Sequence, residues 1–215
     1  ALTGGQAGII TDSQFGAARI KNINVSNLHH LLESGIIPVV CGFQGVTENN
    51  YKFTTLGRGG SDTSAAALGA ALHAEFVEIY TDVEGIMTAD PRIVEEANIL
   101  HQITYAEVCQ MAQNGAKVIH PRAVEIAMSR NIPVYVKSTF SDAPGTLITN
   151  ERSDCNCGSD ISINEHLASG VAHLCDLAQF RIELNPEDLA AGRMLFEDLA
   201  DAGISVGCLN LQTTF

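Results

Sequence analysis

Residues 54–62 read Thr54-Thr55-Leu56-Gly57-Arg58-Gly59-Gly60-Ser61-Asp62, and the rest of the chain is interpreted around this glycine-rich turn. An apolar segment, Ile36 to Phe43, precedes it, and a segment rich in Ala and Leu, Ser64 to His73, follows it. This order predicts a strand, a loop, a turn and then a helix. Glycines let the backbone take positive φ and approach a ligand closely. The first N–H groups of a helix lack partners within the helix and attract anions.

Three side chains of this turn suit a carboxylate or a phosphate ligand. Arg58 provides a planar fork that matches either group. Ser61 and Asp62 are favourable N-cap residues for the helix that follows. On these residues alone, a binding turn and a merely capped turn with a surface arginine remain alternatives, because one glycine-rich turn is a weak motif.

Composition excludes several classes of partner. The chain has 215 residues and a net charge of −13, from 12 basic and 25 acidic residues, which argues against nucleic acid and anionic membrane surfaces. No apolar run approaches the ~20 residues that span a membrane, and no signal peptide is visible. The six cysteines lack zinc-site spacing, so we expect no metal site and free thiols in a reducing cytoplasm. The chain starts without Met and stops within an apolar pattern, so we expect a piece of a longer protein.

Strand and helix patterns alternate along the first 149 residues, which predicts an α/β fold. The run Ile36 to Phe43 is nearly continuously apolar and predicts a strand buried on both faces, as in a parallel sheet. Pro144 predicts that the strand Gly145–Thr149 lies at an edge. The other predicted strands are Ala7–Ile10, Arg19–Val25, Phe76–Tyr80 and Ile132–Lys137, and the predicted helices are Asn27–Glu33, Ser64–His73 (buried between layers), Tyr105–Gln113 and Ala123–Arg130.

Polar residues are concentrated directly after the predicted strand Phe76–Tyr80, in the segment Thr81 to Arg92. Open α/β sheets bind ligands at the carboxyl ends of their strands. Farther along, Thr104 and Glu107 form a predicted capping box, and Pro121 suits the first turn of a helix.

The composition changes at residues 150–160, which are polar and predict a linker. Beyond the linker, short strands are predicted at Leu167–Leu174, Gln179–Leu184 and Ile204–Leu211, with a helix that starts near Asn185. This pattern is half of a small α+β module.

Three motifs together resemble the aspartokinases, within the amino-acid kinases. They are Gly57-Arg58-Gly59-Gly60-Ser61-Asp62-Thr63, then Tyr80-Thr81-Asp82-Val83-Glu84-Gly85-Ile86-Met87-Thr88-Ala89-Asp90-Pro91-Arg92, then Gly115-Ala116-Lys117-Val118-Ile119-His120-Pro121-Arg122-Ala123. The resemblance implies a three-layer amino-acid-kinase fold with a mainly parallel central sheet. It places the carboxyl-terminal part of the catalytic domain at residues 1–149 and a partial ACT-like regulatory domain at 161–215.

The resemblance also implies an activity, the transfer of the ATP γ-phosphate to the side-chain carboxylate of L-aspartate, with Mg²⁺ as cofactor. This step opens the biosynthesis of lysine, threonine and methionine. It further implies an amino-acid effector that binds the ACT region, and a homo-oligomer. Phrases such as Gly42-Phe43-Gln44-Gly45 lean towards the diaminopimelate-sensitive isoform.

The resemblance assigns a role to each candidate site residue. Arg58, Gly60 and Ser61 would bind aspartate. Asp62 would orient the substrate amine and neighbouring lysines, and Lys117 would steady the ATP phosphates, so these two residues are the catalytic candidates. The nucleotide would be bound by Thr81, Asp82, Met87, Arg92 and Lys117.

The chain departs from the family pattern in several places. The Lys-Phe-Gly-Gly segment that cradles the transferred phosphate has no counterpart, nor does a glutamate that contacts aspartate, so we expect this chain alone to be inactive. Met87 stands where many relatives carry Tyr, and Asn185-Pro186-Glu187-Asp188 departs from the usual effector loop. The alternative functions are another amino-acid kinase, such as a glutamate or carbamate kinase, and a non-catalytic regulatory protein that binds an effector.

Overall fold

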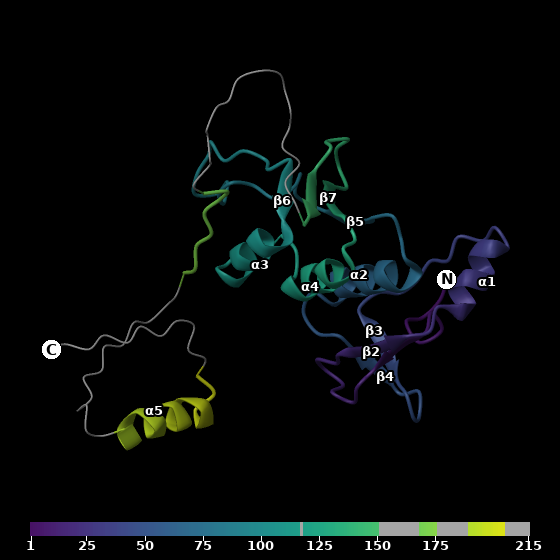
Figure 1. The fold of residues 1–215 in the computed structure, drawn as a ribbon, viewed down its shortest axis with the longest axis horizontal. Coiled ribbons are helices and arrows are strands. Elements are labelled where there is room, and N and C mark those ends of the chain that lie inside the picture. Colours follow the sequence, from purple (N-terminus) through teal and green to yellow (C-terminus); the bar gives the residue numbers. More distant parts are fainter. Residues whose placement is uncertain (117, 151–167, 176–188, 205–215) are drawn as a thin grey trace. The chain divides into compact units, whose positions relative to one another are not determined.

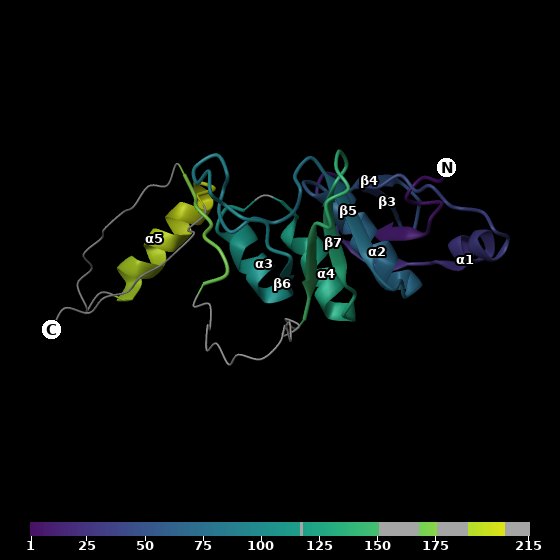
Figure 2. The same cartoon turned by 90° about the horizontal axis from the view of Figure 1, so that it is seen from above.

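The computed structural model describes residues 1–116, 118–150, 168–175 and 189–204. The chain divides into two compact units, Ala1–Leu174 and Cys175–Phe215. Figures 1 and 2 show the elements of the first unit from two directions. Among the described residues, every helix is too short or too polar to cross a lipid bilayer.

The amino-terminal part of the first unit forms a small mixed sheet. Its strand order is β2-β1-β3-β4, with β1 and β3 parallel and the two outer pairings antiparallel. The helix α1 (Ser26–Glu33) follows β2 and ends before Gly35, whose φ of 74° suits a residue just past a helix end. The four strands are β1 (Ile9–Thr11), β2 (Ile20–Ile23), β3 (Gln44–Thr47) and β4 (Phe53–Thr55).

A second four-stranded sheet follows, in the order β5-β7-β8-β6. Two of its pairings, β5–β7 and β6–β8, are parallel, and β7–β8 is antiparallel. This second sheet is therefore mainly parallel, as predicted for the central sheet, and contains one antiparallel pairing. The prediction that residues 145–149 form an edge strand is wrong, because β8 is paired on both sides. The strands are β5 (Val77–Thr81), β6 (Gln102–Thr104), β7 (Val134–Ser138) and β8 (Thr146–Thr149).

Three helices cover one face of the second sheet (Figure 1). The helix α2 contacts β5 on one side and β2 and β3 of the first sheet on the other, which confirms the predicted burial between layers. The predicted capping box starts α3, where Thr104 and Glu107 bond reciprocally, and Pro121 occupies the first turn of α4. The bounds are α2 (Gly60–Leu72), α3 (Tyr105–Gln113) and α4 (Pro121–Arg130).

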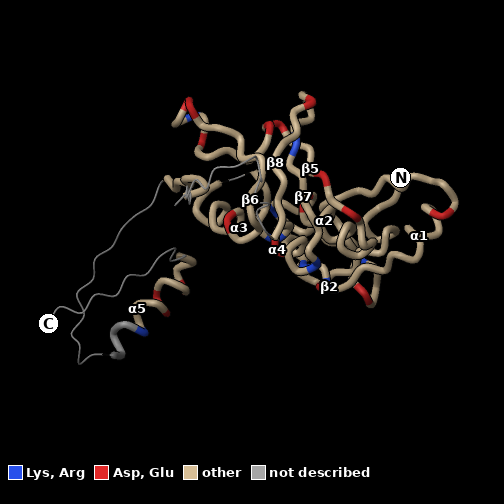
Figure 3. Tube along the Cα trace, turned by 45° about the horizontal axis from the view of Figure 1, so that its top comes forward, with Lys and Arg blue, Asp and Glu red and all other residues tan. Residues whose placement is uncertain are grey.

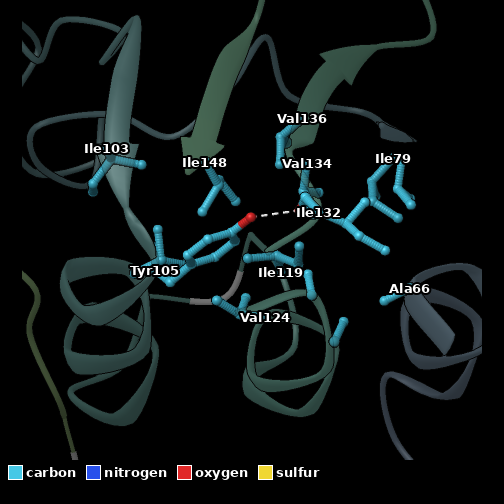
Figure 4. Packing of buried hydrophobic residues seen from close by; sticks show 14 of the residues in the cluster. Ala66, Ile79, Ile103, Tyr105, Ile119, Val124, Ile132, Val134, Val136 and Ile148 are labelled. Atoms are coloured by element: carbon cyan, nitrogen blue, oxygen red, sulfur yellow. Dashed lines mark hydrogen bonds between the residues drawn. The ribbon is translucent and has the colours of Figure 1, made fainter. Parts of the chain in front are cut away.

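The main hydrophobic core lies between the second sheet and these helices (Figure 4). Alternate residues of the strands point into it, among them Ile79, Val134 and Ile148. Tyr105 at the start of α3 is only 1% exposed, and its hydroxyl donates to the backbone carbonyl of Ile132 at 2.5 Å. This core fixes the position of the helix ends that form the candidate site.

The apolar run Ile36 to Phe43 is not a buried strand, so this prediction is wrong. Ile37 is 86% exposed, and within the described residues the strand-type pairing of the run is limited to an isolated bridge between Val40 and Leu2. The strand begins after the run, at Gln44, where β1 and β4 provide partners on both sides. Hydrophobicity predicted burial here, but the described chain places no covering element over these side chains.

The chain after Asn150 is described in part. The predicted linker lies almost wholly outside the described residues. The predicted strand Gln179–Leu184 also lies outside them, as does the predicted strand Ile204–Leu211 except for its first residue. Residues 168–174 form no strand, contrary to prediction, and the predicted helix is α5 (Leu189–Asp201). The assignment of residues 161–215 to an ACT-like domain, and the domain bounds themselves, stay predictions.

Candidate active site

The glycine-rich turn connects β4 directly to α2. Gly57 and Gly59 take φ of 78° and 67°, which residues other than glycine rarely adopt, and α2 begins at Gly60. Gly59 is the N-cap residue, and no side chain caps the helix. The prediction that Ser61 and Asp62 cap a helix from Ser64 is therefore wrong: both lie inside the first turn of α2, which leaves their side chains available for other partners.

The first turn of α2 offers free hydrogen-bond donors. Gly60 N donates to the carbonyl of Gly57 at 3.0 Å, and Thr63 N donates to the carbonyl of Gly59 at 3.1 Å. Within the described residues, the N–H groups of Ser61 and Asp62 have no recorded acceptor. Ser61 and the neighbouring Arg58 are exposed. The turn therefore presents two amides and one guanidinium to solvent, which is the composition of an anion site.

The turn packs against the start of α4. A Cβ atom built on Gly59 would lie 2.2 Å from Cγ of His120, so only glycine leaves room for the imidazole. His120 N donates to Oδ2 of Asp62 at 3.4 Å, and Arg122 Nη1 donates to the carbonyl of Leu56 at 3.4 Å. The first and third sequence motifs therefore meet at the amino ends of α2 and α4.

Sequence reasoning assigned no role to His120 or Arg122, although both lie within the third motif. His120 also caps α4, since its Nδ1 accepts the N–H of Arg122 at 3.3 Å. Pro121 in the first turn of α4 is the sequence signal from which a cap at His120 could have been predicted. Lys117, the other candidate of this motif, lies outside the described residues.

The second motif lies at the carboxyl end of β5. Thr81 ends this strand, and its hydroxyl donates to Oδ1 of the exposed Asp82 at 3.0 Å. Gly69, near the carboxyl end of α2, packs against Val77 at the start of β5, so the helix and the strand run in opposite directions. The amino end of α2 and the carboxyl end of β5 therefore lie at the same edge of the sheet, where open α/β sheets bind ligands.

The loop after β5 is fixed by backbone contacts. Ile86 N donates to Oγ1 of the fully buried Thr146 at 2.8 Å, which ties the loop to β8. Met87 forms a bridge with Ile99, and Thr88 N donates to the carbonyl of Asn98 at 2.8 Å. Met87 is half-buried as a result. Sequence reasoning did not identify Thr146, since a threonine in a strand carries no distinctive signal.

Arg92 is bound by a neighbouring carboxylate in this structure. Its Nε and Nη2 donate to the two oxygens of Asp90 at 3.0 and 2.7 Å, while its side chain stays 85% exposed. These hydrogen bonds and the Arg92 charge lower the pKa of Asp90 to about 2. A nucleotide phosphate that binds Arg92 would therefore share the guanidinium with Asp90 or displace it.

A second ion pair lies on the opposite face of the sheet from the helices. Lys137 Nζ contacts Oε1 of Glu78 at 2.5 Å, and this contact lowers the pKa of Glu78 and raises that of Lys137. The pair joins β5 to β7 and contains no predicted site residue.

A groove of about 410 Å³ lies elsewhere, at the carboxyl ends of α2 and α4. The whole of β2, His73 and Arg130 help to line it, and no predicted site residue does. This groove is therefore separate from the candidate site at the amino ends of these helices. Within the described residues, no group of three or more His, Cys, Asp or Glu side chains could hold a metal ion.

Comparison with known proteins identifies the family. The model of the amino acid kinase family matches residues 2–138. Aspartokinase 1 of Bacillus subtilis (strain 168) is 49% identical over 211 residues, which are 98% of this chain and 51% of that protein. The chain thus spans about half the length of the curated relatives it matches.

Solved structures give the same result. E. coli aspartokinase III, in complex with aspartate and ADP, superposes with a TM-score of 0.62 at 40% identity, over 68% of this chain and 34% of that one. The same enzyme in complex with lysine and aspartate superposes with a TM-score of 0.62 at 39% identity, over 71% of this chain and 36% of that one. Sequence and fold therefore agree, and the chain belongs to the amino acid kinase family.

Proposed function

We propose that the protein containing this chain is an aspartate kinase, which transfers the γ-phosphate of ATP to the side-chain carboxylate of L-aspartate. The observation that carries the proposal is the meeting of the turn Gly57–Asp62 with the His120–Arg122 segment, at the sheet edge where β5 ends. The similar E. coli enzyme has been solved with aspartate and ADP, which supports this choice of substrates.

The residues divide into an aspartate side and a nucleotide side. Arg58 and the free amides of Ser61 and Asp62 suit the carboxylates of aspartate. Gly60 is buried at the start of α2, and its N–H already donates to Gly57, so it would act by letting the turn pack closely. Asp62 is already held by the backbone of His120 and would orient the substrate amine. Thr81, Asp82, Met87 and Arg92 would bind the nucleotide, and Lys117 would steady its phosphates.

Phosphoryl transfer depends mainly on positioning and on electrostatic stabilisation. One carboxylate oxygen of aspartate attacks the γ-phosphorus, the bond to the bridging oxygen breaks, and ADP leaves with that electron pair. Mg²⁺ would neutralise charge on the phosphates; it usually binds through one or two carboxylates and the phosphates themselves, so no preformed cluster of three protein ligands is required. Asp82 is exposed at the end of β5 and suits such a carboxylate.

The test is a coupled ADP assay on the complete polypeptide. Arg58→Ala should raise the KM for aspartate by about 10- to 100-fold with a small effect on the KM for ATP, because a hydrogen-bonded charge pair is lost. Arg130→Ala is the matched control, since this exposed arginine lies at the far end of α4, and it should leave both constants unchanged.

Other outcomes select the alternatives. Turnover of glutamate or carbamate in place of aspartate would identify another amino-acid kinase. Nucleotide binding without turnover would indicate a non-catalytic regulatory protein. We also propose that the 215-residue chain alone does not turn over, because it contains no Lys-Phe-Gly-Gly segment. Normal turnover by these residues in the same assay would contradict this.

We further propose regulation by an amino-acid effector, a homo-oligomeric state and a cytoplasmic location. The similar E. coli enzyme has been solved with lysine, which supports an effector of this class, and the diaminopimelate-sensitive isoform stays a prediction. Cys41, Cys109 and Cys175 are free thiols, as expected in a reducing compartment. Calorimetry with lysine and with diaminopimelate, and sedimentation of the complete polypeptide, test these proposals.

A further inference from the structure

Residues 169–173, which we call the strap, lie against the loop that follows β5. Val171 N donates to the carbonyl of Thr88 at 2.7 Å. A Cβ atom built on Gly170 would lie 3.1 Å from both the Thr88 carbonyl oxygen and Cε of Met111. The Ser169 hydroxyl bonds to Oε1 of Glu107 in the first turn of α3. Three successive residues of the strap therefore make close contacts.

The strap also contacts the turn that leads to Lys117. Gly115 follows α3 with a φ of 108°, and a Cβ atom built on it would lie 2.0 Å from the carbonyl oxygen of His173. The same strap therefore touches the segments that precede two predicted nucleotide-binding residues, Lys117 and Arg92.

Thr88 is held from both sides. Its N–H donates to the carbonyl of Asn98 at 2.8 Å, and its hydroxyl accepts the N–H of Asn98 at 3.0 Å. Its carbonyl accepts the N–H of Val171, which is the only hydrogen bond of that carbonyl within the described residues. Met87, one of the predicted nucleotide-binding residues, directly precedes Thr88.

We infer that the strap positions the nucleotide-binding loop Ile86–Arg92 through the backbone hydrogen bond from Val171 to Thr88. The inference rests on the proposed nucleotide site. The strap residues are positioning residues, because they act through the loop and not on the substrates. Loss of this bond removes a fixed contact on one side of the loop while Asn98 retains the other, so the loop loses order without unfolding.

The main test replaces Val171 in the complete polypeptide. Val171→Pro removes the N–H donor, whereas Val171→Ala keeps it and trims a side chain that is 67% exposed. Val171→Pro should raise the KM for ATP about fivefold to tenfold, the effect of one lost hydrogen bond, and should change the KM for aspartate less than twofold. Val171→Ala should leave both constants unchanged.

A second variant tests the inference in case Val171→Pro does not fold. Gly170→Ala keeps every backbone donor but introduces a Cβ atom that must displace Thr88 or Met111. It should also raise the KM for ATP selectively. If either variant lowers kcat for all substrates together with Tm and leaves the ratio of the two KM values unchanged, the strap serves stability only and the inference is wrong.

Hydrogen exchange gives a readout that does not depend on activity. In the 215-residue chain, the peptide containing Ile86–Arg92 should exchange faster in Val171→Pro than in Val171→Ala. If the parent protein shows no aspartate-dependent ADP formation, the proposed function fails, and the exchange result still decides whether the strap orders the loop. If the parent is active and Val171→Pro alters neither exchange nor the KM for ATP, the function stands and the strap inference is overturned.

Discussion

At the scale of single residues, Tyr105 combines burial with a polar contact. Its ring lies in the core between Ile103, Ile148 and Val124, and its hydroxyl reaches the carbonyl of Ile132 at the start of the connection into β7 (Figure 4). A buried carbonyl that loses its donor keeps its desolvation cost. One hydroxyl therefore links the start of α3 to the chain that follows α4.

Replacement of this hydroxyl should weaken the fold measurably. Tyr105→Phe removes the donor and leaves the ring, so the free energy of unfolding should fall by about 1–3 kcal/mol in urea titration. Tyr51→Phe is the matched control, because Tyr51 is 71% exposed, and surface changes of this kind usually stay within about 0.5 kcal/mol. Equal stability of the two variants would show that the Ile132 carbonyl finds another donor.

The same residue predicts a dependence on pH. Burial raises the pKa of Tyr105 from 10 to about 12. The folded state therefore holds its proton more tightly than the unfolded state, and this contribution to stability is complete below pH 10 and is lost between pH 10 and 12. Stability of the parent chain should fall more steeply than that of Tyr105→Phe across this interval.

At the scale of elements, the contact between Gly59 and His120 joins α2 to α4. Gly59 has a left-handed backbone, and the imidazole of His120 occupies the space where a side chain would project. The starts of α2 and α4 can therefore approach this closely only because Gly59 has no Cβ atom. Arg58, Ser61 and Asp62, which we propose bind aspartate, lie beside this junction.

Gly59→Ala should disturb this junction. The new methyl group meets His120 and also strains the backbone, so we expect a loss of about 1–3 kcal/mol in stability together with a higher KM for aspartate. Gly16→Ala is the control, because a Cβ atom there meets nothing within 4 Å. A double variant with His120→Ala should recover the steric part of the loss, and strict additivity of the two changes would contradict direct contact.

The elements also show which features the sequence can predict. The capping box of α3 and the proline at the start of α4 involve neighbouring residues, so local patterns predicted both helices correctly. The exposed run Ile36 to Phe43 and the interior position of β8 depend on partners far along the chain, which hydrophobicity alone does not reveal.

The candidate site follows the same division. The motif residues were identified from the sequence; Ser61 and Asp62 lie in the first turn of α2 just after Arg58, while Thr81 ends β5 and Asp82 follows it. The roles of His120 and Thr146 were missed, because each acts through a contact with a distant segment.

At the scale of the whole chain, the net negative charge opposes association of two copies through an open sheet edge. Within the described residues β5 pairs only with β7, so its other edge is open, and Phe76 and Tyr80 are exposed beside it. Open edges favour pairing with another chain. The net charge of −13, carried by acidic residues spread over several loops and helices (Figure 3), produces repulsion between copies.

The 215-residue chain should therefore self-associate more strongly as salt increases, because a Debye length of about 8 Å at physiological ionic strength already screens most of this repulsion. Sedimentation at low and high salt measures the effect. Tyr80→Lys should reduce association by placing a charge on the strand, and Tyr51→Lys, far from β5 in the sequence, should change it less. A monomer at every salt concentration would contradict the prediction.

The interleaved strand order of the second sheet has a consequence for biosynthesis. β8 completes that sheet by joining β6 to β7, yet it is the last of the four strands in the chain. During translation, β5 lacks its partner β7 until Ser138 has left the ribosome, and β6 lacks its partner β8 until Thr149 has left it. Long-range pairing of this kind slows folding. The apolar strands of the nascent chain therefore stay exposed until their partners are synthesised, and a chaperone that covers them in this interval would prevent aggregation.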